Sequence, residues 1–220
     1  MTHSTILQRI LDGGIVAVVR SDSPDQLVGV VEALAEGGVT AAEITFTVPD
    51  AVEVIRAVHK ALGDSIVLGA GSVLDSETAR AALLAGAEYI VGPSTNLDVI
   101  RLCKRYGKVV MPGALTPTEV VTAWEAGADI VKIFPSDLGG PSYIKALRAP
   151  LPQIRMMPTG GVDLSTAETF LKAGACCLGV GSSLVEPKAV ASGDFERISE
   201  LARQFRAIVR KFRDEAVGGK

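Results

Sequence analysis

The sequence predicts an α/β protein that folds as a single (β/α)8 (TIM) barrel with a short N-terminal helix. Eight short apolar segments alternate with amphipathic ones at spacings of roughly 20 to 26 residues, the periodicity of βα units. The motif Ala-Gly-Ala recurs at 85–87, 126–128 and 173–175, each time just before an apolar segment. A glycine there suits the end of a helix. A doubly wound open sheet is the alternative, but the chain has no GxGxxG motif after a strand.

Each expected strand is a β-branched or apolar run bounded by turn residues. The strands are expected at residues 15–20, 42–47, 67–73, 89–94, 109–115, 130–136, 155–159 and 176–180. Helices should begin near Ser23, Pro49, Asp75, Leu97, Thr116, Pro141, Asp163 and Asp194. The first and fifth of these starts carry capping boxes, Ser23 to Gln26 and Thr116 to Glu119. No linker or low-complexity segment divides the chain, so one domain is expected over residues 1–220.

Composition excludes several classes of partner. The net charge is −3 with no basic stripe, so neither nucleic acid nor an anionic membrane surface is an expected partner. The N-terminus does not have the pattern of a signal peptide and no stretch reaches membrane-spanning length, which predicts a cytoplasmic protein. Cys103, Cys176 and Cys177 lack metal-ligand spacing and are expected to be small buried residues. No metal or cofactor is expected.

Lys132 lies in the middle of a strand that is apolar on both sides, Ile130 to Phe134. A buried interior disfavours the charged form of an amine, and a neutral amine attacks ketones. We therefore predict that Lys132 is a nucleophile. A lysine that extends its ammonium to solvent is the alternative.

Glu43 is the acidic residue embedded in the second apolar strand. Because alternate residues of a strand share a face, an inward Glu43 places Thr45 and Thr47 inward too. In an eight-stranded barrel the second and sixth strands lie opposite each other, so Glu43 and Lys132 can meet near the axis. The pair is expected to be an imine-forming lysine beside its proton carrier, or else a structural ion pair.

Two glycine-rich loops come after the last two strands. Gly160 and Gly161 lie in one, and Gly181 and Ser182 lie in the other. Backbone N–H groups in such loops can approach an anion closely, and this corner of many barrels binds phosphate. Each glycine pair alone fits a simple tight turn, whereas the two together predict a phosphorylated ligand.

Arg20 and Ser72 end the first and third strands, where either could bind a substrate carboxylate. The alternatives are a rim ion pair for Arg20 and a capping hydroxyl for Ser72. We expect the remaining pocket lining from the residues Thr45, Pro93, Phe134 and Thr159.

Taken together, these motifs resemble the bacterial 2-keto-3-deoxy-6-phosphogluconate (KDPG) aldolase family, which also includes 4-hydroxy-2-oxoglutarate (KHG) aldolases. The resemblance runs from Ile15 to about Val185 and rests on residues 38–39 with 43–45, 69–73, 131–135, 158–162 and 179–182. It implies a class I aldolase with Lys132 as Schiff-base residue and Glu43 as general acid and base. It also implies a phosphate site at the two glycine loops and a homotrimer.

The implied reaction cleaves KDPG to pyruvate and glyceraldehyde 3-phosphate. The alternative substrates are KHG and 2-keto-3-deoxy-6-phosphogalactonate. Many relatives have an arginine at the position of Thr47 and a threonine at that of Ser72, both of which help to hold the substrate carboxylate. Arg20 could supply the missing charge. Two other classes of protein are alternatives to an aldolase: a phosphosugar epimerase or isomerase, and a phosphosugar sensor without catalytic activity.

Overall fold

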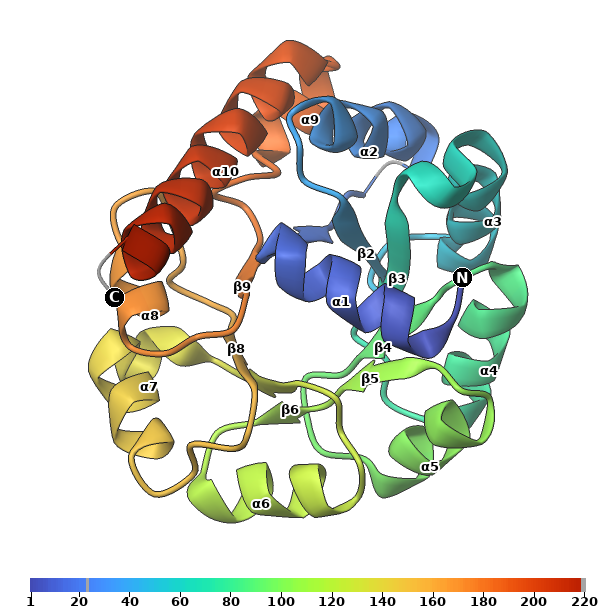
Figure 1. Cartoon of the computed structure of the whole chain (residues 1–220). Coiled ribbons are helices and arrows are strands. Elements are labelled where there is room, and N and C mark those ends of the chain that lie inside the picture. Colours follow the sequence, from blue (N-terminus) through green and yellow to red (C-terminus); the bar gives the residue numbers. More distant parts are fainter. Residues whose placement is uncertain (23, 219–220) are drawn as a thin grey trace.

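The computed structural model describes residues 1–22 and 24–218 as parallel strands surrounded by helices (Figure 1). Ser23, predicted to cap a helix, lies outside these residues. The helices are α1 (His3–Gly13), α2 (Leu27–Glu36), α3 (Ala51–Leu62), α4 (Ser76–Ala85), α5 (Leu97–Arg105), α6 (Pro117–Glu125), α7 (Gly140–Arg148), α8 (Ala167–Lys172), α9 (Pro187–Ser192) and α10 (Phe195–Gly218), with 3-10 turns η1 (Pro24–Gln26), η2 (Gly63–Ser65) and η3 (Ser136–Leu138). The strands are β1 (Ile15–Val19), β2 (Ala41–Thr45), β3 (Val67–Gly71), β4 (Tyr89–Val91), β5 (Val109–Met111), β6 (Gly113–Ala114), β7 (Val131–Ile133), β8 (Met156–Pro158) and β9 (Leu178–Val180).

Hydrogen bonding divides the strands into two parallel sheets. One is a curled sheet of six strands in the order β5-β4-β3-β2-β1-β9, and the other has three in the order β6-β7-β8. An isolated bridge between Thr159 and Gly179 links β8 to β9. The prediction of an α/β fold with parallel strands and surrounding helices is therefore confirmed. The hydrogen bonds between strands form two sheets, however, and not the single closed ring of eight strands that was predicted.

Pro112 explains why the predicted strand at 109–115 is observed as two. Proline has no N–H to donate to a ladder, so a strand that contains it is interrupted. Before Pro112, β5 pairs with β4; after it, β6 pairs with β7. The stretch therefore changes partner at Pro112 and belongs to both sheets.

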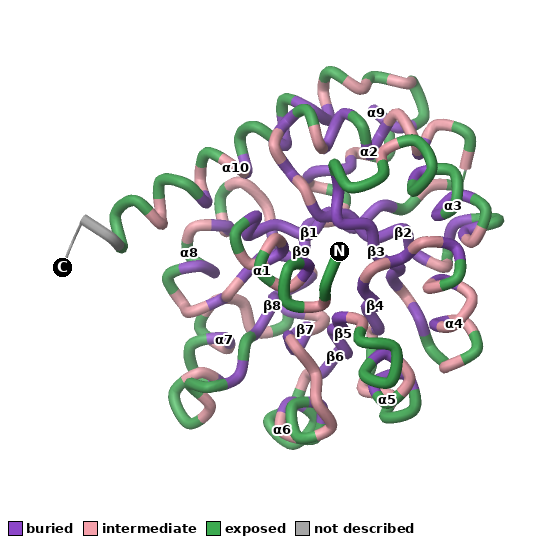
Figure 2. The backbone as a smooth tube through the Cα atoms, turned by 45° about the vertical axis from the view of Figure 1, so that its right-hand side comes forward, coloured by how far each residue is buried: buried purple, intermediate pink, exposed green. Residues whose placement is uncertain are grey.

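Alternation along the strands separates two apolar layers. Ile15, Ala17 and Val19 of β1 pack in the layer beneath the helices. The opposite faces form a second group, here called the inner cluster. Its members are Val16, Ala41, Val67, Tyr89, Val91, Val109, Met111, Ile130, Met157 and Cys177, together with Ile6 and Ile10 of α1. Figure 2 shows the strands buried and the outer faces of the helices exposed.

Helix α1 covers the end of the strands where each strand begins. Ile6 and Ile10 are buried in the inner cluster, and α1 lies across the strands in Figure 1. Arginines of α10 hold this helix from outside: Arg206 donates to the carbonyl of Gly13, and Arg213 to those of Asp12 and Leu11. These bonds satisfy carbonyls that the end of a helix leaves unpaired.

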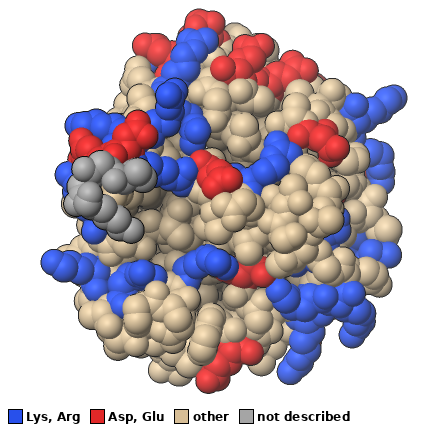
Figure 3. Space-filling model, viewed as in Figure 1, with Lys and Arg blue, Asp and Glu red and all other residues tan. Residues whose placement is uncertain are grey.

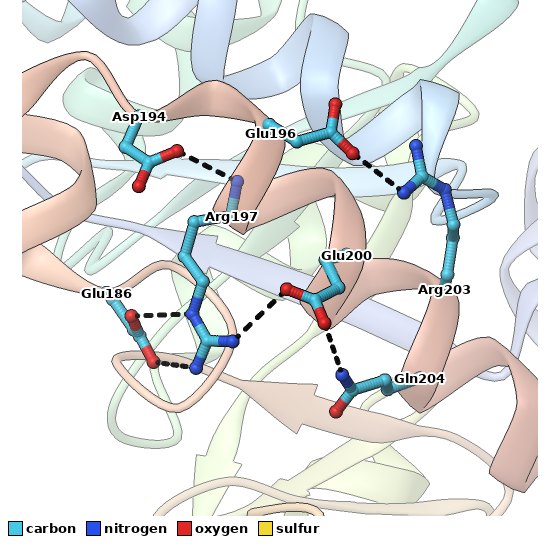
Figure 4. Close-up of polar contacts among 7 residues, drawn as sticks. All are labelled: Glu186, Asp194, Glu196, Arg197, Glu200, Arg203 and Gln204. Carbon is cyan, nitrogen blue, oxygen red and sulfur yellow. Dashed lines mark hydrogen bonds and ion pairs between the residues drawn. The ribbon is translucent and has the colours of Figure 1, made fainter.

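A polar network fixes the segment after β9 to the start of α10 (Figure 4). Arg197 donates to both carboxylate oxygens of Glu186, at 2.9 and 3.2 Å, and also to Glu200 at 3.4 Å. Arg203 pairs with Glu196 at 3.0 Å. Exposed pairs of this kind contribute little each, but the two-point bond to Glu186 constrains where the preceding loop lies.

Most observed strands are shorter than predicted, and α9 was not predicted. The strand expected at 89–94 ends at Val91, and the one expected at 130–136 covers only Val131–Ile133. The length of a strand depends on which neighbouring strands form hydrogen bonds with it. The apolar pattern of a single segment does not identify those neighbours. Helix α9 has six residues, too few for a helical period to be recognised.

Charged side chains of both signs are distributed over the face shown in Figure 3, with Lys and Arg mainly toward its edges. No helix of residues 1–22 and 24–218 has the length and apolar character needed to cross a membrane.

The observed capping box of α6 gives a stability prediction. The Thr116 hydroxyl accepts from the N–H of Glu119, whose carboxylate accepts from the N–H of Thr116. Thr116→Ala should lower the free energy of unfolding by about 1 kcal/mol, measured by urea denaturation. Thr118→Ala, an exposed change in the same turn, is the control and should stay within about 0.5 kcal/mol. Equal losses in both variants would contradict the capping role.

Candidate active site

Lys132 lies at the centre of β7 with only 3% of its surface exposed. Its neighbours Val131 and Ile133 pack beneath the helices, so the lysine points to the opposite, inner side of the sheet. Its Nζ lies 4.9 Å from the centroid of the Phe134 ring, a distance at which the ring face attracts an ammonium. The structure thus buries Lys132 on the face that the alternation predicted.

Glu43 is fully buried in β2, and its carboxylate extends over the neighbouring strand β3. A Cβ added at Gly71 would collide with Oε1 and Cδ of Glu43, so the glycine provides the space that the carboxylate occupies. Burial raises the pKa of Glu43 above its usual value, and the positive charges of Lys132 and Arg20 oppose this shift. These two charges act on one carboxylate, which makes the three residues a single electrostatic group.

Within the described residues, neither oxygen of Glu43 has a hydrogen-bond partner, and no ion pair joins it to Lys132. A buried carboxylate without a partner is costly, and proteins rarely keep one for stability alone. The geometry therefore does not support the alternative that Glu43 and Lys132 form a direct structural ion pair. Both groups remain free to contact a ligand placed between them.

A cavity of about 270 Å³ opens at the ends of the strands opposite α1. Val18 and Phe134 line it; Val18 is the strand partner of Glu43, and the Phe134 ring faces Lys132. The two charged residues themselves are not part of the lining, but each neighbours one residue that is. Of the predicted residues, the cavity is lined by Arg20, Phe134, Thr159, Gly160, Gly161, Gly181 and Ser182.

The two glycine loops meet on one side of this cavity. Gly160 and Gly161 have φ angles of 94° and 69°, a left-handed conformation that other residues rarely adopt. Asp137 packs against both, and Ser136 donates to the Gly160 carbonyl at 2.5 Å. Ser182 is exposed at the start of the other loop. Consecutive left-handed glycines can turn their N–H groups toward an anion.

Arg20 borders two cavities. It lines the first one and also a neighbouring cavity of about 450 Å³, which Thr47 and Gln26 line as well. Thr45 lies below them: its hydroxyl donates to the Val19 carbonyl at 3.3 Å and shares a hydrogen bond of 2.7 Å with the Thr47 hydroxyl. Arg20 is thus the cation placed at the junction, with Thr45 and Thr47 forming a hydroxyl pair beside it.

Ser72 and Pro93, like Thr45, Glu43 and Lys132, line neither cavity. Ser72 comes directly after β3 in a left-handed conformation with a φ of 57°, half-buried. Pro93 packs its backbone against Gly113, where an added Cβ would collide with the Pro93 carbonyl. The structure therefore does not bring Ser72 or Pro93 into contact with either cavity.

The sequence reasoning missed the packing around strand β3. Gly69 and Gly71 lie on its inner face and are covered by Tyr89 and Glu43 respectively. Thr159, similarly, occupies the space beside Gly179, and its buried hydroxyl has no partner in the described chain. Glycines spaced two apart in a strand are the signal that could have indicated this close packing.

Comparison with known proteins identifies the family. The family model described as "Aldolase: KDPG and KHG aldolase" matches residues 6–201. The chain belongs to the KDPG and KHG aldolase family. It is therefore an aldolase, a carbon–carbon lyase, and the resemblance inferred from its motifs is confirmed.

Relatives with two different names match nearly the whole chain. A 2-dehydro-3-deoxy-6-phosphogalactonate aldolase of Escherichia coli (strain K12) is 37% identical and covers 91% of this chain and 95% of its own. A 2-dehydro-3-deoxy-phosphogluconate aldolase of Treponema pallidum (strain Nichols) is 34% identical, covering 93% and 98%.

Solved structures show the same arrangement. One titled "Native KDPGal structure" has a TM-score of 0.85 at 37% identity, covering 91% of this chain and 96% of its own. A KDPG aldolase of Legionella pneumophila, with pyruvate captured as a covalent carbinolamine, has a TM-score of 0.84 at 23% identity, covering 92% and 97%. At that identity, the second structure supports the fold alone.

Gly71 gives a direct test of how Glu43 is placed. Gly71→Ala would push the carboxylate away from its position over β3, and a misplacement of about 1 Å can cost about 10²-fold in rate. We expect a fall of that order in kcat for aldol cleavage, measured with a coupled assay for released pyruvate. Gly13→Ala is the matched control, because its nearest atom would be 3.4 Å from the added Cβ. An unchanged kcat in Gly71→Ala would separate Glu43 from the chemistry.

Proposed function

We propose that this aldolase cleaves KDPG to pyruvate and glyceraldehyde 3-phosphate through a Schiff base on Lys132. The observation that carries this proposal is a lysine and a carboxylate buried beside one cavity, both pointing inward and not bonded to each other. A structural pair would be bonded, whereas a reacting pair needs space between its groups for the substrate.

Lys132 as a free amine attacks the C2 ketone, and the carbonyl oxygen takes up a proton to give a carbinolamine. Glu43 in its acid form then protonates this hydroxyl, which leaves as water as the C2–N iminium forms. The raised pKa of Glu43 suits such a proton carrier, because a group titrating nearer neutral pH can both give and accept protons.

Ionised Glu43 next removes the proton of the C4 hydroxyl, through water where the distance requires it. The C3–C4 bond breaks, its electrons pass into the iminium, and the aldehyde forms at C4. The enamine left on Lys132 takes a proton at C3 and is hydrolysed to pyruvate and free lysine. Arg20, positioned beside both cavities, is proposed to bind the substrate carboxylate together with Thr47, which lines the second cavity.

The far end of the substrate is assigned to the two glycine loops. We propose that the N–H groups around Gly160, Gly161, Gly181 and Ser182, which line the cavity, bind the phosphate. Phe134 and Thr159 complete the lining of the proposed pocket, with Thr45 behind Thr47. A phosphate held there leaves the ketone end directed toward Lys132.

The names of the relatives make 2-keto-3-deoxy-6-phosphogalactonate a second candidate substrate. The galactonate-named relative of E. coli is 37% identical to this chain and the gluconate-named relative of T. pallidum 34%, so similarity alone leaves both epimers as candidates. Both epimers would give the same two products through the same steps. KHG is the third candidate, and kcat/KM measured on all three substrates ranks them.

Four finer expectations remain proposals. We propose that the two sheets act as one closed eight-stranded barrel, supported by the Thr159–Gly179 bridge and the shared stretch at Pro112. We also propose that residues 1–220 form a single domain, that the protein is a homotrimer and that it is located in the cytoplasm. Exposed large apolar side chains such as Leu84 and Leu138 are compatible with subunit contacts.

Borohydride trapping tests the nucleophile. Incubation with pyruvate and borohydride should reduce the Schiff base, inactivate the enzyme and label Lys132, as mapped by peptide mass spectrometry. Lys132→Ala should be neither labelled nor active, and EDTA should leave the activity of the unmodified protein intact. A label on exposed Lys145, or loss of activity on chelation, would refute the class I assignment for this site.

Glu43→Gln separates the roles of the two buried residues within the same experiment. The amide cannot move protons, so cleavage should fall by about 10² to 10⁴ while slow trapping on Lys132 persists. Solvent exchange of the pyruvate methyl protons, which reports enamine formation, should fall together with cleavage. A variant that cleaves substrate at nearly the rate of the unmodified protein would assign Glu43 a purely structural role.

Ser182 tests the phosphate site. Ser182→Asp places a carboxylate where the phosphate is proposed to bind, so kcat/KM for phosphorylated substrates should fall roughly tenfold or more. KHG has no phosphate and should be affected much less. Ser182→Asn, similar in size but neutral, is the matched control. Equal losses on phosphorylated substrates and KHG would exclude this corner from the binding site.

A further inference from the structure

Tyr89 is a buried aromatic residue to which the proposed chemistry gives no role. It is completely buried in the inner cluster at the first position of β4. Its hydroxyl has no hydrogen-bond partner among the residues that the structure describes. A buried, unpaired hydroxyl costs free energy that phenylalanine would avoid, so its presence requires an explanation.

The strand register places this hydroxyl on the same side as Glu43. Glu43 is the Cα partner of Gly69, and Gly69 is the Cα partner of Tyr89, so the three residues occupy neighbouring strands at one level. In parallel strands, partners at one level project to the same face. Because Gly69 has no side chain, nothing from β3 separates Tyr89 from Glu43 at this level.

The ring of Tyr89 uses the space that Gly69 provides. A Cβ added at Gly69 would collide first with Cε2 and Cζ of the ring. Since Cζ carries the hydroxyl, the polar end of the ring extends across β3 in the direction of β2. Glu43 extends over Gly71 from the opposite side, two residues further along the same strand. The phenol and the carboxylate therefore approach each other over one strand.

The electrostatics agree with this geometry. Burial raises the pKa of Tyr89, and the negative charges of Glu43 and Cys177 raise it further. The ionisable groups that face the pair are Lys132 from β7, Arg20 after β1 and Cys177 before β9. Helix α1 contributes the apolar side chains of Ile6 and Ile10 to the same cluster. Tyr89 is therefore the neutral hydrogen-bond donor of this interior group.

We propose that Tyr89 is a positioning residue for Glu43: its hydroxyl donates a hydrogen bond to the carboxylate through one bridging water. This proposal rests on the proposed function, in which Glu43 carries protons. Donation to the ionised carboxylate stabilises that form and so counters part of the effect of burial. The bond also limits the directions in which the carboxylate can turn, keeping it available to a substrate on Lys132.

Tyr89→Phe removes the hydroxyl while retaining the ring that fills the space at Gly69. Without the donor, the pKa of Glu43 should rise by about one unit. The acidic limb of the kcat/KM profile should shift to higher pH by the same amount, because cleavage requires the ionised carboxylate. Trapping of pyruvate on Lys132 should persist. Tyr143→Phe, which removes a phenol that packs in the helix layer and donates to the Leu115 carbonyl, is the matched control.

The titration of Glu43 is measured without reference to activity. Carbon NMR of labelled glutamate carboxyls, with the Glu43 signal assigned by its loss in Glu43→Gln, gives its pKa in each variant. A pKa that is the same in Tyr89→Phe as in the unmodified protein overturns the proposal, whatever the enzyme does. If the pKa shifts but no cleavage activity exists, the pairing stands and the proposed function fails.

A second measurement keeps Tyr89 in place. The chain has three tyrosines, so fluorine NMR of protein labelled with 3-fluorotyrosine should resolve each of them. The Tyr89 signal should move with pH over the range in which Glu43 titrates and should lose this response in Glu43→Gln. Exposed Tyr106 and half-buried Tyr143 serve as internal references. A Tyr89 signal insensitive to Glu43 would also overturn the proposal.

Discussion

Burial of an amine and a carboxylate between the strands of one protein constrains everything around them. Removing such groups from water is expensive, so the interior can be neither wholly apolar nor open to solvent. The fold resolves this by dividing the enclosed space along the strands. The half near α1 is filled by the apolar inner cluster, and the other half contains Glu43, Thr45 and Lys132 next to the cavity.

Room for these groups comes from glycines on inner faces. Gly69, Gly71 and Gly179 are each covered by a larger side chain from a neighbouring strand, namely Tyr89, Glu43 and Thr159. These larger side chains are therefore held by adjacent segments as well as by their own. Glu43 and Lys132 lie on strands, rigid elements that define geometry better than loops do. The segment after β9 is restrained separately, through the two-point bond between Glu186 and Arg197.

Features that depend only on the period of two along a strand could be predicted from the sequence. The inward directions of Lys132 and Glu43 need only a buried strand with a polar residue in it. Features that depend on strand partners could not. The break at Pro112 matters because β5 and β6 pair with different strands, and Tyr89 resembles an ordinary core aromatic until its register with Gly69 and Glu43 is known. Ser72 and Pro93 were placed by position in the chain, which does not report side-chain direction.

Helix α1 closes one end of the space between the strands with Ile6 and Ile10, while the cavity opens at the other end. The mouth of the proposed site is therefore at the end opposite α1. Under the proposed chemistry the phosphorylated aldehyde lies between the mouth and the lysine, whereas the three-carbon enamine lies deeper. The order of release follows from this placement: the aldehyde departs first, water then reaches the covalent adduct, and pyruvate is the last to leave.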